Sequence, residues 1–232
     1  MQSTTVFDRD RTDVQVQNDF IRRVFNWMAL GLGTTALSAL VSANAGVVNA
    51  LAAHPILMLL LIVGEFGIVI SLSAAIAKIE STTALLMFFI YAVLTGITFS
   101  TIFLVYTKGS IASTFFITGG TFAAMSIYGS TTRRDLTSLG SFLTMGLIGL
   151  IIASVVNFFF RSPAFYWIIT YAGIAIFTGL TAYDAQMVKA MAYAGFAGSE
   201  EERKGAIIGA LRLYLDFINL FLLLLRIFGR RR

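Results

Sequence analysis

Seven apolar stretches, each about 20 residues long or longer, dominate this sequence and limit what it can fold into. A helix needs about 20 apolar residues to cross the hydrocarbon core of a bilayer, and no other open structure satisfies its backbone hydrogen bonds there. The stretches cover approximately residues 24–48, 55–77, 83–107, 110–129, 139–160, 163–183 and 206–228. The sequence therefore predicts an all-α integral membrane protein with seven transmembrane helices.

The composition supports this class and excludes several others. Of the 232 residues, 57% are hydrophobic and 12% are charged, which leaves too little polar surface to cover a water-soluble globule. The chain has no cysteine, which excludes disulfides, thiolate nucleophiles, iron–sulfur clusters and cysteine-ligated zinc. The net charge of +5 is scattered over the ends of the apolar stretches, so we expect no nucleic-acid partner.

The order of polar and apolar residues also predicts how the chain is organised. We expect residues 1–23 to form a polar cytoplasmic tail, residues 24–229 a single seven-helix membrane domain, and residues 230–232 a basic end. The first twenty residues carry both charge signs, unlike a secretory signal, so we expect the first apolar stretch to be kept as a span. Pro55 and Pro163 stand at the first turn of a predicted helix, where the missing N–H costs nothing.

Lysine and arginine indicate the orientation, because they mark the cytoplasmic side of a membrane protein. Ten of them lie in the tail or after the second, fourth and sixth stretches, whereas only Lys108 and Arg161 follow the first, third and fifth. We therefore expect a cytoplasmic amino terminus in a multi-pass protein of a bacterial inner membrane. Arg226 and the arginines at 230–232 break the rule if the seventh stretch spans fully; the alternative is a re-entrant seventh helix.

Three acidic residues lie inside or directly beside the apolar stretches, namely Glu65, Asp184 and Asp216. A carboxylate at the bilayer centre costs about 2.5–3.5 kcal/mol, which indicates a role in the bundle interior or in a water-lined path. If the sixth helix continues to about residue 191 and the seventh begins near residue 204, these antiparallel helices bring both aspartates into one layer. Two carboxylates in one low-dielectric site share a proton, so they form a proton-sensitive switch or a cation ligand.

Neighbouring residues leave other readings open. Asn219 lies on the same helix face as Asp216 and could add a neutral oxygen to the site. Arg212 is four residues before Asp216 and could neutralise it within the helix, while Asp184 could instead cap the connector in contact with headgroup water. Glu65 is either a neutral, hydrogen-bonded residue packed against another helix or an ion ligand.

Several segments resemble the transmembrane Bax-inhibitor-motif (Bax inhibitor-1-like) family. They are Thr-Ala-Tyr-Asp-Ala-Gln at 181–186, Leu-Tyr-Leu-Asp-Phe-Ile-Asn-Leu-Phe at 213–221, Ser-Ile-Tyr-Gly-Ser-Thr-Thr-Arg-Arg-Asp-Leu at 126–136, and Glu65 in the second stretch. Residues 213–221 carry the most specific match. The ending Leu-Leu-Arg-Ile-Phe-Gly at 224–229 looks like the bacterial inner-membrane branch. The resemblance covers nearly all of the chain after the tail.

The resemblance implies a bundle with the seventh helix at its centre and a calcium-permeable, proton-sensitive leak through it. In that picture Asp184 and Asp216 form a hydrogen-bonded pH sensor and act as transient calcium ligands, and Glu65 lines the path or supports the packing. Some members have an arginine on the second helix that latches the aspartates, whereas this chain has only Lys78 at the helix end. Arg212 stands where a small polar residue is expected, and its charge would oppose a passing cation.

The sequence leaves three classes of function to compare: a channel, a regulator and an enzyme. We expect a pH-sensitive calcium leak whose ligands are calcium and protons within the lipid bilayer. The alternative is a non-conducting regulator that binds membrane proteases or stress-response partners, with the polar tail as a contact. We do not expect an enzyme or a cofactor: the Gly-x-Gly-Asp context of intramembrane aspartyl proteases is missing at Asp216, and the single histidine, His54, has no catalytic neighbours.

Overall fold

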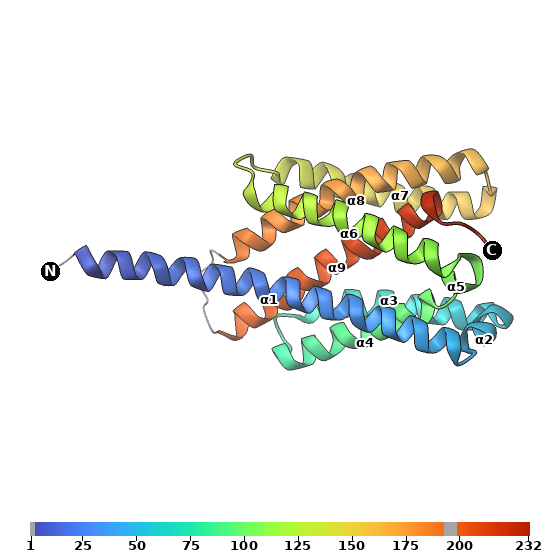
Figure 1. Ribbon diagram of the computed structural model, residues 1–232, viewed down its shortest axis with the longest axis horizontal. Coiled ribbons are helices and arrows are strands. Elements are labelled where there is room, and N and C mark those ends of the chain that lie inside the picture. Colours follow the sequence, from blue (N-terminus) through green and yellow to red (C-terminus); the bar gives the residue numbers. More distant parts are fainter. Residues whose placement is uncertain (1–2, 193–198) are drawn as a thin grey trace. The chain divides into compact units, whose positions relative to one another are not determined.

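The computed structural model describes residues 3–192 and 199–232, with side chains from residue 15 onward, and nearly all of this part is helical (Figure 1). The helices are α1 (Ser3–Asn44), α2 (Val47–Ala53), α3 (Pro55–Ala75), α4 (Ser81–Phe99), α5 (Ile102–Val105), α6 (Lys108–Thr131), α7 (Thr137–Phe160), α8 (Pro163–Ala192) and α9 (Glu200–Phe228). Seven segments are long and apolar enough to cross a membrane: Gln15–Asn44 of α1, Ser81–Val105 of α4 and α5, and the whole of α3, α6, α7, α8 and α9. The predicted all-α class with seven spans is confirmed.

Most helix ends lie where the sequence predicts them. Pro55 and Pro163 are the first residues of α3 and α8. The first span ends earlier than the predicted residue 48, because the chain turns at Gly46, whose φ of 76° is in the left-handed region that glycine adopts at little cost. The start of α9 at Glu200 is four residues before the predicted position, and the acidic first turn of this helix is favourable beside its amino terminus.

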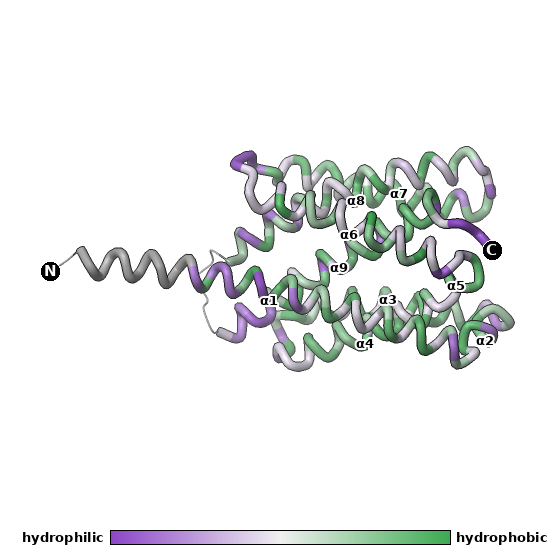
Figure 2. The backbone as a smooth tube through the Cα atoms, in the orientation of Figure 1, coloured by the Kyte–Doolittle hydropathy of each residue, from purple (hydrophilic) through white to green (hydrophobic). Residues whose placement is uncertain are grey.

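Apolar side chains cover the outer surfaces of the helices. Hydrophobic residues fill the helices and hydrophilic ones gather at the connectors (Figure 2). Exposed side chains such as those of Ile70, Phe116 and Phe142 are what a lipid environment requires and water does not tolerate in such number. In the most apolar window of α9, 72% of residues are buried, against 6% in α3. Among the described spans, α9 has the largest buried share, and the central place expected for the seventh helix stays a prediction.

The chain divides into two compact units, and α9 contributes to both. The first unit contains Met1–Val105 and Val188–Tyr214, and the second contains Tyr106–Met187 and Leu215–Arg232. The predicted boundaries of the membrane domain, at residues 23 and 229, do not correspond to this division and stay a prediction.

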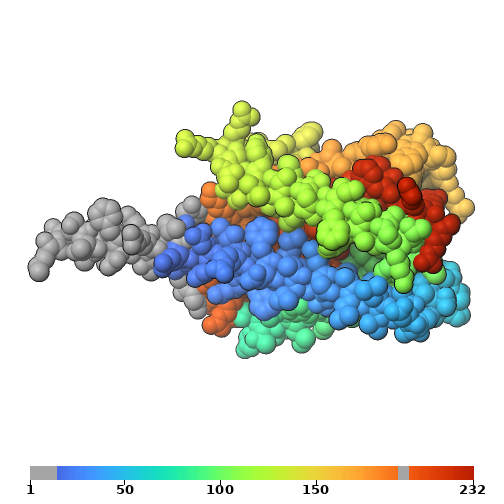
Figure 3. Space-filling model, viewed as in Figure 1, coloured from blue at the N-terminus to red at the C-terminus, as the bar shows by residue number. Residues whose placement is uncertain are grey.

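In the first unit, α1 packs along α4, as their adjacent surfaces show (Figure 3). Gly96 of α4 makes this possible, because a Cβ atom there would lie 2.5 Å from the backbone oxygen of Thr35 on α1. At the start of α4, the Glu200 carboxylate accepts hydrogen bonds from the backbone N–H and the hydroxyl of Ser81, at 2.5 and 2.9 Å. The beginning of α9 is thereby fixed to the beginning of α4.

In the second unit, α6, α7 and α8 pack against the later half of α9. A cluster of apolar side chains joins α7, α8 and α9: Leu143, Phe177, Leu180, Leu220, Leu223 and Leu224. The ring of Phe217 on α9 lies edge-on to Phe115 and Phe122 of α6, with ring centres 5.3 and 5.6 Å apart. These contacts fix the face of α9 that each neighbour covers.

Candidate functional site

The structure places Asp184 on α8 and Asp216 on α9, both within the second unit and both inside membrane-spanning helices. Their side chains are buried, with exposed fractions of 8% and 4%. Burying a carboxylate is costly unless its surroundings compensate for it, and buried charges in membrane helices mark functional sites more often than other residues do. The two aspartates are therefore the first residues to consider for function.

The register of α8 against α9 brings these aspartates to the same level. Leu180 of α8 and Leu220 of α9 belong to one cluster, and Gly173 of α8 lies against Leu223 of α9. Asp184 is one turn beyond Leu180 on the same helix face, and Asp216 is one turn before Leu220 on its face. Since the helices are antiparallel, one turn in each direction leads to the same layer. The shared layer is inferred from this register, and the roles expected for the two aspartates stay a prediction.

The residues before Asp184 seat α8 tightly against its neighbours. A Cβ atom on Gly129 of α6 would overlap the backbone carbonyl of Ala182, and one on Gly140 of α7 would overlap the ring of Tyr183. Glycine at these two positions lets the helices approach closely, as in other membrane bundles. The backbone that carries Asp184 is thus held between α6 and α7.

Gln186, two residues after Asp184, binds the connector between α6 and α7. Its side-chain oxygen accepts the backbone N–H of Leu136 at 2.8 Å, and its amide nitrogen donates to the backbone oxygen of Arg134, also at 2.8 Å. One side chain thus satisfies a donor and an acceptor of a non-helical segment. The motif at 181–186 and the motif at 126–136, which the sequence singled out separately, are parts of one arrangement.

Glu65 belongs to the first unit, on α3. Its carboxylate accepts a hydrogen bond of 2.5 Å from the hydroxyl of Thr98 on α4. Of the two readings of Glu65, this contact favours the hydrogen-bonded residue packed against a neighbouring helix. Thr98 was not identified from the sequence.

Arg212 and Asn219, the two supporting residues expected on α9, lie on either side of Asp216. Arg212 has an exposed side chain and belongs to the first unit. The Asn219 amide nitrogen donates to the backbone oxygen of Leu215 at 2.8 Å, which leaves the amide oxygen for another partner.

Sequence reasoning missed a polar contact of Tyr214, which is fully buried in the first unit. Its hydroxyl oxygen lies 2.6 Å from the hydroxyl of Thr35 on α1, and Thr35 in turn reaches the backbone oxygens of Gly31 and Ala92, each at 3.0 Å. Either hydroxyl can donate to the other, because each carries one hydrogen and can also accept. In the sequence, only the position of Tyr214, two residues before Asp216, pointed to this contact.

Asp184 and Asp216 are the buried acidic side chains that this site offers to a proton or a metal ion. Calcium takes six to eight oxygen ligands, and the described residues include no cluster of three or more acidic, histidine or cysteine side chains. That Asp184 and Asp216 act as transient calcium ligands stays a prediction.

Comparison with known proteins covers almost the whole chain. The profile of the family described as "Inhibitor of apoptosis-promoting Bax1" matches residues 17–232. The "Inner membrane protein YbhL" of Escherichia coli K12 is 48% identical over 215 residues, which cover 92% of each chain. Uncharacterized proteins of Borreliella burgdorferi and Rickettsia prowazekii are 44% and 41% identical, with 97% and 98% of this chain covered and 97% and 96% of theirs.

Proposed function

The chain belongs to the family of inhibitors of apoptosis-promoting Bax1, and from that premise we propose that it is a pH-sensitive cation leak of the inner membrane, with calcium as the permeant ion. The location follows from the seven apolar helices and from the Escherichia coli relative, whose name describes an inner membrane protein. The amino terminus faces the cytoplasm in this proposal, so the carboxyl terminus, after seven spans, lies on the opposite side.

One observation carries the proposal, namely that two buried aspartates lie in the same layer of the α8–α9 pair. Asp184 and Asp216 are the only acidic residues of the second unit within its membrane spans. A shared proton neutralises one carboxylate and leaves the pair singly charged, whereas loss of that proton places two negative charges in a buried layer. Mutual repulsion then favours separation of α8 from α9.

The apolar cluster that joins α7, α8 and α9 lies beside the aspartates, so their repulsion would act on it. Leu180 and Leu220 lie one turn from the two carboxylates and seal the α8–α9 contact with apolar side chains. Separation at the aspartate layer would loosen this seal and admit water and a hydrated cation. Protonation restores the closed contact, so the leak is expected to rise as the pH rises.

The experiment is calcium influx into proteoliposomes, scanned from acid to alkaline pH. The wild type should show flux that depends on pH. Asp184→Asn and Asp216→Asn, which hold one member of the pair permanently neutral, should each abolish most of that dependence. Asp135→Asn is the matched control, because it removes the same charge from an exposed carboxylate in the connector before α7 and should leave the pH profile unchanged.

The outcomes separate the leak from the regulator considered above. A pH profile that is unchanged in both aspartate variants would mean that the pair does not control the leak. Flux no greater than that of empty vesicles at every pH would end the leak proposal and favour a non-conducting regulator of membrane proteins.

A further inference from the structure

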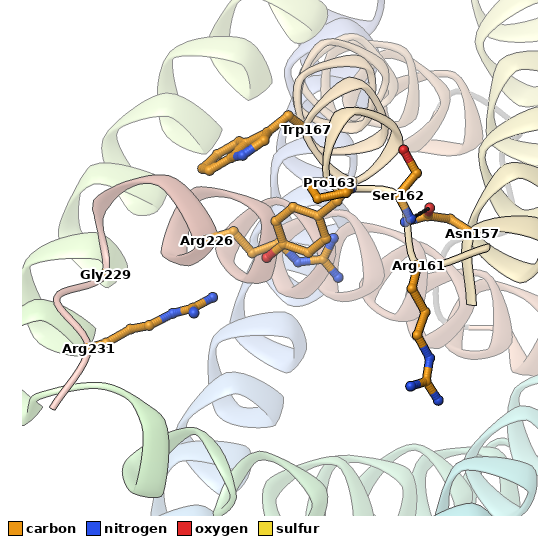
Figure 4. A pocket seen from close by; sticks show the side chains of 9 residues that line it. Asn157, Arg161, Ser162, Pro163, Trp167, Arg226, Gly229 and Arg231 are labelled. Carbon is orange, nitrogen blue, oxygen red and sulfur yellow. Dashed lines mark hydrogen bonds between the residues drawn. The ribbon is translucent and has the colours of Figure 1, made fainter. Parts of the chain in front are cut away.

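We propose that the second unit carries a binding site for the phosphate of an anionic phospholipid, at the end where α7 meets α8 and where α9 ends. A cavity of about 550 Å³ opens there, which is of the size that holds small ligands in other proteins. Three arginines line it, Arg161, Arg226 and Arg231, and no carboxylate is among its described lining residues (Figure 4). Such a group of guanidinium groups without a counter-charge fits a phosphate.

Two of the arginines are held in place by the fold. The guanidinium of Arg226 lies over the ring of Tyr166, 5.2 Å from its centre. Arg231 follows the end of α9, where its backbone pairs with Tyr106 and the neighbouring Arg230 oxygen accepts the Thr107 N–H at 3.0 Å. The last residues are thus fixed against the start of α6. From this position Arg231 extends toward the cavity that Arg226 and Trp167 also line (Figure 4).

Arg161 occupies a backbone position that glycine would fill at lower cost. It ends α7 with φ 51° and ψ 35°, the single positive φ at a non-glycine residue in the described part of the chain. A side chain in this left-handed region is disfavoured, and such outliers concentrate at functional sites. Asn157 supports the turn by accepting the Ser162 N–H on its side-chain oxygen at 3.0 Å. A glycine would make the same turn without a guanidinium, so the charge accounts for the arginine.

A lipid explains the surroundings better than free phosphate does. Phe158, Phe159 and Phe160, at the end of α7, are 72%, 75% and 79% exposed, and Trp167 on the first turns of α8 is 42% exposed. Tryptophan beside a helix end is typical of the interface between lipid headgroups and acyl chains, and exposed phenylalanine rings suit the acyl chains themselves. The site thus offers cations to a headgroup and apolar rings to the chains below it.

The site also accounts for an exception in the charge distribution. Arg161, Arg226 and Arg231 are among the cations that a cytoplasmic amino terminus places on the outer side, against the usual preference. Neutralisation by a bound anionic headgroup makes positive residues acceptable on that side.

The test is lipid retention by the purified protein in a neutral detergent, measured by native mass spectrometry. The probes are phosphatidylglycerol, phosphatidylcholine and inorganic phosphate. The variants are Arg231→Gln and Arg161→Gly, with Arg232→Gln as the matched control, because it removes the same charge one residue away and does not line the cavity. Arg161→Gly should fold at least as well as the wild type, since glycine suits this turn.

We expect the wild type to retain phosphatidylglycerol, and Arg231→Gln and Arg161→Gly each to weaken its apparent Kd by roughly tenfold, the effect of losing one charge-assisted hydrogen bond. The Arg232→Gln variant should stay within about twofold of the wild type, on the ground that exposed charges contribute little. Equal weakening in Arg231→Gln and Arg232→Gln, or equal retention of phosphatidylcholine, would overturn the site. Inorganic phosphate bound as tightly as the lipid would identify a phosphate site and refute the lipid.

Discussion

The close contact between Gly129 on α6 and Ala182 on α8 gives a sharp prediction for Gly129→Ala. The added Cβ atom would overlap the carbonyl oxygen of Ala182 and approach the carbonyl carbon at 2.7 Å and the Cα atom at 2.9 Å. These are backbone atoms, so no side-chain rotation can relieve the overlap. The two helices must separate, and the segment that carries Asp184 moves with α8.

The expected cost can be worked out from two opposing effects. Overpacking of a close contact costs about 1–3 kcal/mol, and a backbone neighbour places this case at the upper end. Alanine gains about 0.5–1 kcal/mol over glycine inside a helix. The net loss in the free energy of unfolding is therefore about 2 kcal/mol, which corresponds to a fall in Tm of about 4–8 °C for a chain of this length.

Thermal unfolding of the purified protein in detergent, followed by tryptophan fluorescence, measures this effect. Gly120→Ala is the matched control, because it makes the same change on the same helix and its Cβ atom would have no neighbour within 4 Å. It should melt at or slightly above the wild-type temperature. A Tm for Gly129→Ala that equals that of Gly120→Ala would refute the argument that α6 and α8 are in backbone contact at this position.

Three further outcomes are expected. Tyr214→Phe should lower the free energy of unfolding by about 1 kcal/mol, measured by denaturant titration, because the hydroxyl of Thr35 loses a hydrogen-bond partner; an unchanged value would mean that water replaces the tyrosine hydroxyl. Gln186→Leu should speed tryptic cleavage after the two arginines before α7, since the backbone N–H of Leu136 loses its side-chain acceptor. Equal cleavage rates would mean that Gln186 does not hold this connector in place. The hydroxyl and the backbone N–H of Thr137 lower the pKa of Asp135. The Asp135 carboxylate therefore stabilises the fold fully above its ordinary pKa of 3.8, and this stabilisation is lost as the pH falls through the lowered pKa. An NMR titration midpoint at or above 3.8 would contradict this.

Much of the fold could be predicted because a bilayer imposes a simple rule. The length of an apolar stretch determines whether it spans, and the prolines at 55 and 163 mark two helix starts without any tertiary information. The first apolar stretch lies within a longer helix, because α1 continues through the polar residues before it.

Part of the candidate site could be predicted from the sequence and part could not. Asp184 and Asp216 were found because charged residues are rare in apolar spans, and a short connector implies that their helices are antiparallel neighbours. The partners of Gln186 and Tyr214 were not found, because they lie about 50 and 179 positions away along the chain. Common residue types such as threonine and a backbone carbonyl give no signal in sequence until the helices that carry them have been paired.

The division of α9 between two units has a consequence for biosynthesis. Both units are discontinuous in sequence, and each takes its last segment from α9, up to Tyr214 in one and from Leu215 in the other. Because the ribosome delivers the spans in order, the earlier helices enter the bilayer before α9 supplies Tyr214 to Thr35 and three leucines to the apolar cluster of α7 and α8. Assembly therefore cannot proceed unit by unit, and a chain truncated before α9 should leave two incomplete bundles for membrane quality control rather than one finished half.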